Sequence, residues 1–395
     1  MHVLFVTGEY PPLRGGVGAY TAELAHALVD IGSQVSVLTT RQAHPAVQPT
    51  NAVTVHALIE RWDWRIWHQA AQLAKQIGAT WLHVQYQTAA FAMHPAINLA
   101  PDYWRRGQPF RVAWTYHDLL VPYLFPKAGA RLRRWITERP AHTSHIVIAT
   151  NTGDYQQLAV CALTAPLVKI PIGSNIHVHA SSPSARAQAR AQDRRERGYT
   201  ESTVVLGYFG FLNHSKGGLT LIQTLQELVL QGIDAHLLMI GERIGASDPT
   251  NEAYLQSVEA LITELHLEQR VQWTGHLADA EASRALHMVD LLFMPYLDGA
   301  SLRRGTLMAG LAHGCAIVTT APQSPLPELV NGRDLLYVPP GDAQAAASAI
   351  RQVMQQPTLR TQLATNAQRQ SEQFTWATIA QQHRAHYQSP LTTQQ

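Results

Sequence analysis

Short apolar runs alternate with helix-period stretches along almost the whole chain, and this alternation restricts the fold more than any other feature. In the first half, the runs that predict strands cover residues 2–8, 34–40, 80–86, 111–116, 145–150 and 167–172. Between the first two, GAYTAELAHALVDIG carries apolar residues at the spacing of one helix face. Such alternation predicts βαβ units, and therefore parallel sheets that are covered by helices on both faces.

A change in composition separates two such series. Residues 179–202 are small and polar without a strand-like run, which predicts a linker that carries a surface helix. Beyond it, strands are expected at 203–211, 235–241, 270–275, 289–296, 315–320 and 334–340. A chain of 395 residues also exceeds one ordinary domain. We therefore expect an α/β protein of two doubly wound, Rossmann-like domains facing each other across a cleft, with ligands beyond the carboxyl ends of the strands.

The composition argues against several classes of protein. A formal charge of +2 gives no reason to expect nucleic-acid binding. The 20 histidines include no His-x-x-x-His pair and no Cys/His cluster, so no metal site is expected. Cys161 and Cys315 belong to no motif, as is typical of buried residues in a reducing compartment. No apolar run approaches the roughly 20 residues of a membrane span, and the N-terminus predicts a strand rather than a signal peptide, so we expect a soluble, cytoplasmic chain.

The segment TGEYPPLRGGVGAYTAEL (7–24) predicts a strand, a loop and a helix start. Gly15, Gly16 and Gly18 would let the backbone approach a ligand, and the helix start offers N–H groups to phosphates or hydroxyls. The match to G-x-G-x-x-G is incomplete, and the second strand ends without an acidic residue for a ribose, which disfavours a nicotinamide dehydrogenase. A tight turn without a ligand is the alternative.

Two further loops carry candidate residues. In FGFLNHSKGGLTLIQTL, Lys216 precedes a helix start, where its charge opposes the helix dipole unless an anion is shared by both. In AWTYHDLL, His117 and Asp118 follow a strand and can hold a hydroxyl or move a proton. The alternatives are an exposed lysine beside a turn, and a packed histidine next to a capping aspartate.

Aromatic and basic residues are mixed in YWRRGQPFR (103–111) and YLFPKAGARLRRWI (123–136). A membrane surface or an anionic acceptor would suit such faces, and contact with a membrane would bring a cytoplasmic protein to its inner face. The alternative is solvated charges whose apolar stems pack against the protein.

Taken in order, these segments resemble the large GT4 group of retaining glycosyltransferases, which have the two-domain GT-B fold. The resemblance rests on EYPPLRGGVGAYTAELAHAL, YHD, FGFLNHSKGGLTLIQTL, VQWTGHLADAEASRALHMVDLLFMPY, AGLAHGCAIVTT, NGRDLLYVPPGDAQAAASAI and FTWATIAQQHRAHY. It implies an acceptor domain at 1–178, a linker at 179–202 and a nucleotide-sugar domain at 203–375. A helix at about 376–390 would return to the first domain, as FTWATIAQQHRAHY is similar to the family's crossing helix.

The resemblance also implies a reaction and its residues. A sugar would pass from a nucleotide diphosphate-sugar to a hydroxyl of a glycan, a lipid-linked sugar or a small molecule, with retention of configuration and without a metal or cofactor. His117 would belong to the catalytic region, and Lys216 would bind phosphate. The other donor-binding residues that it implies are Gly15, Gly16 and Gly18 near the phosphates and Gly275, His276 and Leu277 at the nucleobase.

The chain departs from the family at three positions. Phe211 stands where the family usually has an arginine, and Ser301 and Ala309 stand where it has the two glutamates of E-x7-E. A carboxylate missing at the ribose should cost about 1.5–3 kcal/mol. The loop DGASLRRGTLMAGLAHG nevertheless predicts a donor-binding surface made of Asp298, Ser301, Arg303, Arg304, Gly305 and Thr306.

Within that loop we predict a replacement for each lost group. Arg303 or Arg304 would supply the positive charge, since arginine grips phosphate with two donors. Asp298 would accept a sugar hydroxyl, and the helix start at Gly305–Thr306 would offer N–H groups. Two alternatives stay open: a nucleotide- or sugar-binding protein without activity, and another enzyme on the same fold, such as a sugar phosphorylase or an epimerase.

Overall fold

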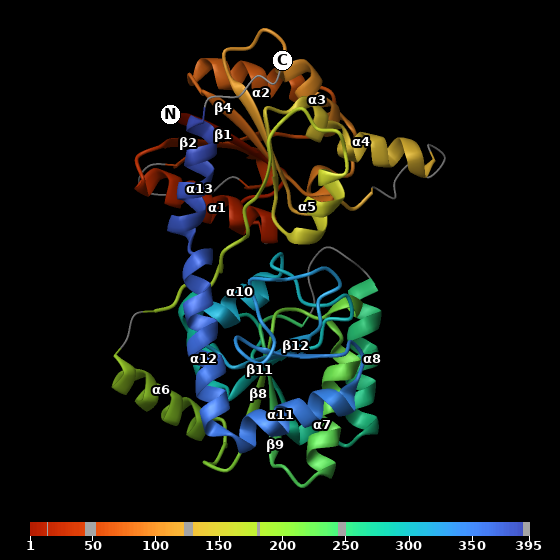
Figure 1. The fold of residues 1–395 in the computed structure, drawn as a ribbon, viewed down its shortest axis with the longest axis vertical. Coiled ribbons are helices and arrows are strands. Elements are labelled where there is room, and N and C mark those ends of the chain that lie inside the picture. Colours follow the sequence, from red (N-terminus) through yellow and green to blue (C-terminus); the bar gives the residue numbers. More distant parts are fainter. Residues whose placement is uncertain (14, 44–52, 122–128, 180–181, 244–249, 390–395) are drawn as a thin grey trace. The chain divides into compact units, whose positions relative to one another are not determined.

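The computed structural model describes residues 1–13, 15–43, 53–121, 129–179, 182–243 and 250–389. The chain divides into two compact units (Figure 1). Unit 1 comprises Met1–Asn175 and Phe374–Gln395, and unit 2 comprises Ile176–Gln373. Each unit is an α/β body of its own, with one parallel sheet among its described residues.

The sheet described in unit 1 has seven parallel strands in the order β3-β2-β1-β4-β5-β6-β7. Their bounds are β1 (His2–Thr7), β2 (Gln34–Thr40), β3 (Val53–Ile59), β4 (Trp81–Tyr86), β5 (Arg111–Tyr116), β6 (Ile146–Ala149) and β7 (Leu167–Lys169). The six expected strands are confirmed, but β3 was not predicted. It lies at the sheet edge and alternates buried with exposed residues, so it lacks the continuous apolar run of its neighbours.

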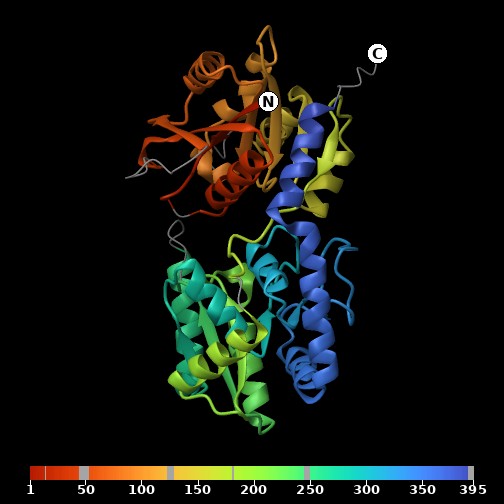
Figure 2. The same ribbon diagram turned by 90° about the vertical axis from the view of Figure 1, so that its left-hand side faces the viewer.

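Helices cover both faces of this sheet (Figures 1 and 2). They are α1 (Gly16–Asp30), α2 (Ile66–Gln76), α3 (Ala96–Trp104), α4 (Ala130–Thr143), α5 (Thr152–Ala159) and α13 (Trp376–Gln388). Alternate residues of β1 face separate cores, Leu4 in one and Phe5 in the other, because successive strand side chains point to opposite faces. Helix α13 comes from the far end of the chain and packs beside α1, where Tyr387 is buried.

The sheet described in unit 2 has six parallel strands in the order β10-β9-β8-β11-β12-β13. The strands are β8 (Val204–Phe209), β9 (Ala235–Ile240), β10 (Val271–Trp273), β11 (Leu291–Met294), β12 (Ile317–Thr320) and β13 (Leu336–Val338), and all six were expected. The helices are α6 (Pro183–Glu196), α7 (Gly218–Leu230), α8 (Thr250–Glu264), α9 (Asp279–Met288), α10 (Gly305–Ala312), α11 (Ala343–Gln355) and α12 (Pro357–Ser371). The main core lies between the sheet and α7, α8 and α11.

The segment predicted as a linker falls within unit 2 and is attached to it by polar contacts. Its helix α6 buries no residue. Arg190 donates to the carboxylate of Asp290 at 2.6 Å and to the carbonyl of Val289 at 2.7 Å, at the end of α9. Arg194 donates to the same carboxylate at 3.1 Å. Residues 182–202 therefore belong to unit 2 rather than forming a free connector, because arginines can anchor a helix that lacks an apolar face.

Candidate active site

The predicted site residues lie after the carboxyl ends of strands in both units. In unit 1 the sheet order makes the segments after β1, β4 and β5 neighbours. In unit 2 the segments after β10, β9, β8 and β11 are neighbours in that order. Because open parallel sheets bind ligands at this edge, each set of loops is a candidate ligand-binding surface.

The glycine loop of unit 1 already holds a carboxylate of the protein itself. Glu9 accepts the backbone N–H groups of Val17 at 3.1 Å and Gly18 at 3.4 Å, at the start of α1. A Cβ atom on Gly15 would lie 2.1 Å from the carboxylate oxygen of Glu9. Burial raises the pKa of Glu9, while these two N–H groups oppose the shift. The N–H groups of Val17 and Gly18 at the start of α1 are thus already paired within the protein, and phosphate binding by Gly15, Gly16 and Gly18 stays a prediction.

His117 ends a chain of polar side chains that runs into the core of unit 1. Its Nε2 lies 2.9 Å from the amide oxygen of Gln85, which requires Nε2 to carry the proton. Gln85 faces His83 at 3.5 Å, and His83 in turn bonds the hydroxyl of Tyr387 on α13. Burial lowers the pKa of His117 to about 3. The ring is therefore neutral at physiological pH, and its Nδ1 can accept a hydrogen bond from a hydroxyl.

Asp118 is buried directly after His117. Its Oδ1 accepts the N–H of Leu120 at 3.2 Å, as in an Asx turn. This geometry agrees with the structural alternative, in which the carboxylate shapes the turn. A catalytic role for Asp118 stays a prediction.

In unit 2 the loops after β8 and β11 are bonded to each other. The N–H of Leu297 donates to the carbonyl of Ser215 at 2.8 Å. Gly217 has a φ of 71°, and a Cβ atom there would lie 1.9 Å from the carbonyl oxygen of Pro295. Only glycine combines this conformation with so close a contact. The lysine loop is consequently held in one position against the β11–α10 loop.

Lys216 is 7% exposed, so the alternative of a solvent-exposed lysine is wrong. Its ammonium group lies 3.5 Å from the ring centroid of Phe211, the residue that replaces the expected arginine. Among the described residues, no side chain or carbonyl accepts a hydrogen bond from this ammonium group. Burial, and after it the charge of Arg304, lowers the pKa of Lys216 to about 7. A buried cation without a counter-ion is the arrangement that an anionic ligand would stabilise.

The two arginines after β11 differ in their surroundings. The side chain of Arg304 is 14% exposed and bonds both carboxylate oxygens of Asp298. Its guanidinium carbon lies 4.8 Å from the ring centroid of Tyr296. Arg303 is more exposed and approaches Asp298 only at 3.5 Å. The carboxylate of Asp298 is thus engaged by Arg304, while its contact with a sugar hydroxyl stays a prediction.

The two positions of the missing glutamates are not equivalent. Ser301 is partly exposed, and its Oγ accepts the N–H of Arg303 at 3.4 Å. Ala309 is fully buried within α10 and therefore cannot contact a ligand in this structure. Gly305 and Thr306 begin α10, and the Thr306 hydroxyl is fixed 2.6 Å from that of Tyr296.

The segment predicted to bind the nucleobase follows β10. Gly275 forms an isolated bridge with Gly241, and the hydroxyl of Thr274 accepts the N–H of Gly241 at 2.9 Å. His276 is exposed, and its Nδ1 lies 3.4 Å from a carboxylate oxygen of Glu242. Leu277 is partly exposed beside it. These contacts hold the ends of β9 and β10 together beside the lysine loop in the strand order.

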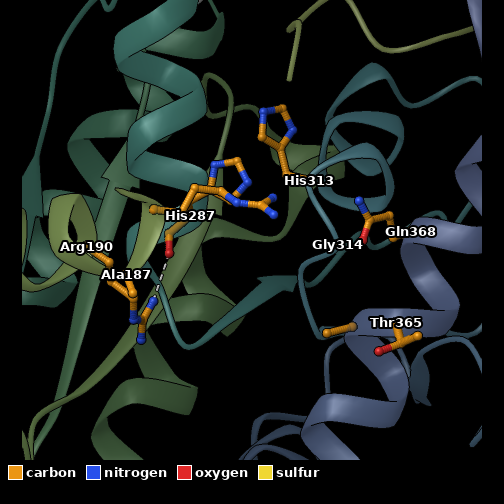
Figure 3. Close-up of a pocket in the computed structure, with 9 residues that line it drawn as sticks. Ala187, Arg190, His287, His313, Gly314, Thr365 and Gln368 are labelled. Carbon is orange, nitrogen blue, oxygen red and sulfur yellow. Dashed lines mark hydrogen bonds between the residues drawn. The ribbon is translucent and has the colours of Figure 1, made fainter. Parts of the chain in front are cut away.

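A cavity of about 280 Å³ lies elsewhere in unit 2 (Figure 3). Its lining consists of Arg186, Ala187, Arg190, His287, His313, Gly314, Ala364, Thr365 and Gln368. His287 precedes β11 and Gly314 precedes β12, so the cavity is at the amino ends of these strands. The catalytic edge of a parallel sheet is the opposite one, and the cavity is therefore not the candidate site.

Sequence reasoning missed several residues that shape these surfaces. Glu9 and Glu242 were not predicted, although each lies two residues beyond the carboxyl end of a strand, and Gln85 lies within the last two residues of β4. The position relative to the strand is the signal that could have found them. Tyr296 packs against Arg304. The sequence does not indicate this role, because Tyr296 is the last residue of the apolar run before the loop.

The described residues contain neither a membrane-spanning helix nor a cluster of metal ligands. No described helix has both the length and the apolar character needed to cross a bilayer. Within the same part of the chain, no three His, Cys, Asp or Glu residues are grouped so that they could hold a metal ion.

Two family models match the chain. The model described as Glycosyltransferase Family 4 matches residues 14–173, and the model described as Glycosyl transferases group 1 matches residues 203–356. A phosphatidyl-myo-inositol mannosyltransferase of Mycolicibacterium smegmatis is 24% identical over 56% of this chain, a match that spans only 51% of that protein. A glycogen synthase of Mycobacterium tuberculosis is 24% identical over 96% of this chain and 92% of its own length.

Solved structures agree on the fold. Anabaena HepE in complex with UDP and glucose has a TM-score of 0.74 at 19% identity and covers 98% of this chain and 99% of its own. Sucrose-phosphate synthase from Thermosynechococcus elongatus has a TM-score of 0.73 at 20% identity, with 98% of each chain covered. At such low sequence identity, the similarity to these solved structures shows the fold alone. The family is shown by the two family models, which together match both units. The chain is therefore a glycosyltransferase of the group 1 type, built from the two Rossmann-like domains of the GT-B fold.

Proposed function

We propose that this protein transfers a sugar from a nucleotide diphosphate-sugar to an acceptor hydroxyl, with retention of configuration and without a metal or cofactor. The observation that carries the proposal is the buried Lys216, whose ammonium group has no anionic partner among the described residues. A diphosphate at the start of α10 would supply the missing negative charge. The UDP and UDP-glucose complexes of HepE support a nucleotide-sugar as the donor.

The proposed mechanism uses this positive surface when the glycosidic bond breaks. Negative charge then develops on the leaving diphosphate, and Lys216, an arginine and backbone N–H groups stabilise it. The acceptor hydroxyl attacks from the face that the nucleotide leaves and passes its proton to a departing phosphate oxygen, as the family resemblance implies. In unit 1, the neutral His117 would orient an acceptor or sugar hydroxyl through Nδ1.

The direct test of the proposed function is a thermal-shift screen with UDP, GDP, ADP and their sugars. A ligand at about 100 times its Kd should stabilise the folded protein by about 2.7 kcal/mol, which is an easily measured shift in Tm. A donor found in this way is then incubated with glycan, lipid-linked and small-molecule acceptors. The proposal is wrong if no nucleoside diphosphate stabilises the protein.

The same experiments distinguish the two alternatives. One is a binding protein without activity, and the other is a different enzyme, such as a phosphorylase or an epimerase. Ser301 and Ala309 motivate the first of these alternatives, because both replace carboxylates of the family. A binding protein would be stabilised by a nucleotide but would turn over no donor with any acceptor. A phosphorylase would require inorganic phosphate, and an epimerase would interconvert nucleotide sugars without an acceptor.

Lys216 should make nucleotide binding depend on pH. Its pKa in the free protein is about 7, lowered by burial and by Arg304. A bound diphosphate favours the charged lysine, so above pH 7 binding must take up a proton. We expect the Kd for the nucleoside diphosphate to rise by up to about tenfold per pH unit above pH 7, measured by calorimetry. Lys216→Arg should remove this dependence because its guanidinium stays charged, and an equally steep Kd profile in that variant would contradict the assignment.

We also propose that the start of α4 contacts an anionic membrane surface, which would place the protein at the periphery of the membrane. The first turns of α4 stand away from the sheet of unit 1 (Figure 1). Leu132 and Trp135 are 47% and 50% exposed there, beside the exposed Arg131 and Arg134. Exposed apolar side chains interleaved with arginines favour the interface of an anionic bilayer. The neighbouring residues 122–128 of the predicted face lie outside the described residues.

Vesicle co-sedimentation tests the membrane proposal. Changing both Arg131 and Arg134 to Glu should reduce binding to vesicles of phosphatidylcholine with phosphatidylglycerol by at least tenfold, since each basic residue near such a surface contributes about 1 kcal/mol. The matched control changes Arg195 and Arg351 of unit 2 to Glu, which alters the net charge equally. Equal loss of binding in both variants would show that only net charge matters.

A further inference from the structure

We propose that Arg304, positioned by the carboxylate of Asp298, is the second diphosphate-binding cation of this protein. Arg304 would then act in place of the family arginine that Phe211 replaces. The proposal rests on the proposed function and deepens it by naming which residue of the β11–α10 loop binds the donor. It also gives Asp298 a role other than contact with a sugar hydroxyl.

Two contacts fix the guanidinium group of Arg304. Its Nη2 bonds both oxygens of Asp298, and its central carbon lies 4.8 Å from the ring centroid of Tyr296. The backbone of Arg304 is in addition the N-cap of α10. Tyr296 is itself held by its hydroxyl contact with Thr306. A guanidinium group held in this way loses little side-chain freedom when it binds a ligand. Arg303 has only the 3.5 Å contact and is more exposed, so it is not held in the same way.

Part of the hydrogen-bonding capacity of Arg304 is unused. The contacts with Asp298 involve Nη2 alone, and Nε is buried without a hydrogen-bond partner. At the adjoining helix start, the N–H groups of Gly305 and Thr306 have no acceptor in the described part of the chain. A buried donor without a partner costs about 1–3 kcal/mol, which an oxygen-rich ligand would recover.

Gly210 lies between the start of α10 and Lys216. A Cβ atom on Gly210 would lie 2.8 Å from the Thr306 methyl carbon and 3.4 Å from the Lys216 ammonium nitrogen. The start of α10 and the buried lysine therefore lie side by side. The charge of Arg304 also acts on Lys216, whose pKa it helps to lower.

The charges at this surface do not balance. Lys216 and Arg304 are two neighbouring cations, and Asp298 is the one carboxylate found paired with either of them in the described residues. A nucleoside diphosphate carries more than one negative charge and presents several acceptor oxygens. Arginine matches such oxygens with two parallel donors, whereas lysine acts as a point charge. The pair is therefore suited to a diphosphate rather than to the nucleobase or the sugar.

Calorimetric titration with UDP, GDP and ADP tests the proposal, with uridine, guanosine and adenosine as probes that lack the diphosphate. Arg304→Gln should weaken binding of the preferred nucleoside diphosphate at least tenfold and leave its nucleoside unaffected. The Kd of Arg304→Lys for the nucleoside diphosphate should lie between that of Arg304→Gln and that of the unmodified protein. Arg351→Gln, the matched control at an exposed arginine of the same unit, should change the Kd by less than twofold.

Asp298→Asn shows whether Asp298 positions Arg304 or only balances its charge, because the two roles change the affinity for the nucleoside diphosphate in opposite directions. Removing a negative charge beside the site should by itself strengthen the binding of an anion. If Asp298 positions Arg304, the variant instead binds the nucleoside diphosphate at least threefold more weakly. Circular dichroism and the Tm establish that each variant is folded, and Asp298→Asn keeps the proposal testable should Arg304→Gln fail to fold.

The outcomes distinguish this inference from the proposed function. If Lys216→Ala loses nucleotide binding while Arg304→Gln retains it, or if Asp298→Asn binds equally or more tightly, the inference is overturned and the proposed function survives. If the unmodified protein binds no nucleoside diphosphate, the proposed function fails as well.

Discussion

Lys216→Ala is expected to lower kcat/KM for an identified donor at least tenfold, which corresponds to about 1.4 kcal/mol or more of lost transition-state stabilisation. The ammonium group is buried above Phe211, next to the start of α10, and has no counter-ion there among the described residues. Its interaction with the leaving diphosphate strengthens as the glycosidic bond breaks. Steady-state kinetics with the donor from the thermal-shift screen provide the measurement.

Two further variants show whether charge or packing causes the loss. Lys216→Met keeps most of the apolar stem but removes the charge, so it should be as inactive as Lys216→Ala. Because it also removes a buried cation that has no partner, its Tm without nucleotide should not be lower than that of the unmodified protein. Lys75→Ala, on the exposed face of α2, is the matched control and should retain full activity. Unchanged turnover in Lys216→Ala would show that the donor site is elsewhere.

Asp290→Ala is expected to lower the free energy of unfolding by about 3 kcal/mol, the largest stability effect that we predict. The carboxylate is 9% exposed and accepts hydrogen bonds from Arg190, Arg194 and the backbone N–H of Val205. Its removal leaves two anchoring arginines without their anion and a strand N–H without its acceptor. Helix α6 should also detach first, because no apolar residue holds it.

Denaturant unfolding, followed by circular dichroism, measures this effect, and limited proteolysis within residues 183–196 reports whether α6 has detached. Arg195→Ala is the matched control, because Arg195 is an exposed residue of the same helix. It should change the stability by less than about 0.5 kcal/mol. Equal stability of Asp290→Ala and the unmodified protein would mean that α6 is held by other contacts.

The sequence alone predicted the strands of both sheets except β3, and the loops in which we propose the site. Local periodicity predicts strands well when both faces are buried, as in β1 and β8, because nearly every residue is then apolar. The same rule explains why β3 was missed, since it is a half-exposed edge strand. Chain order also placed His117 and Lys216 after strand ends, which was sufficient to propose them as functional residues.

Only the tertiary structure decided what these residues contact. The sequence showed two adjacent arginines, and packing against Tyr296 and Asp298 distinguishes Arg304 from Arg303. Likewise, Lys216 becomes a buried cation only because its loop is bonded to the loop after β11. Periodicity reports the local conformation of the backbone, whereas burial and charge pairing depend on segments that are distant in sequence and meet only when the sheet forms.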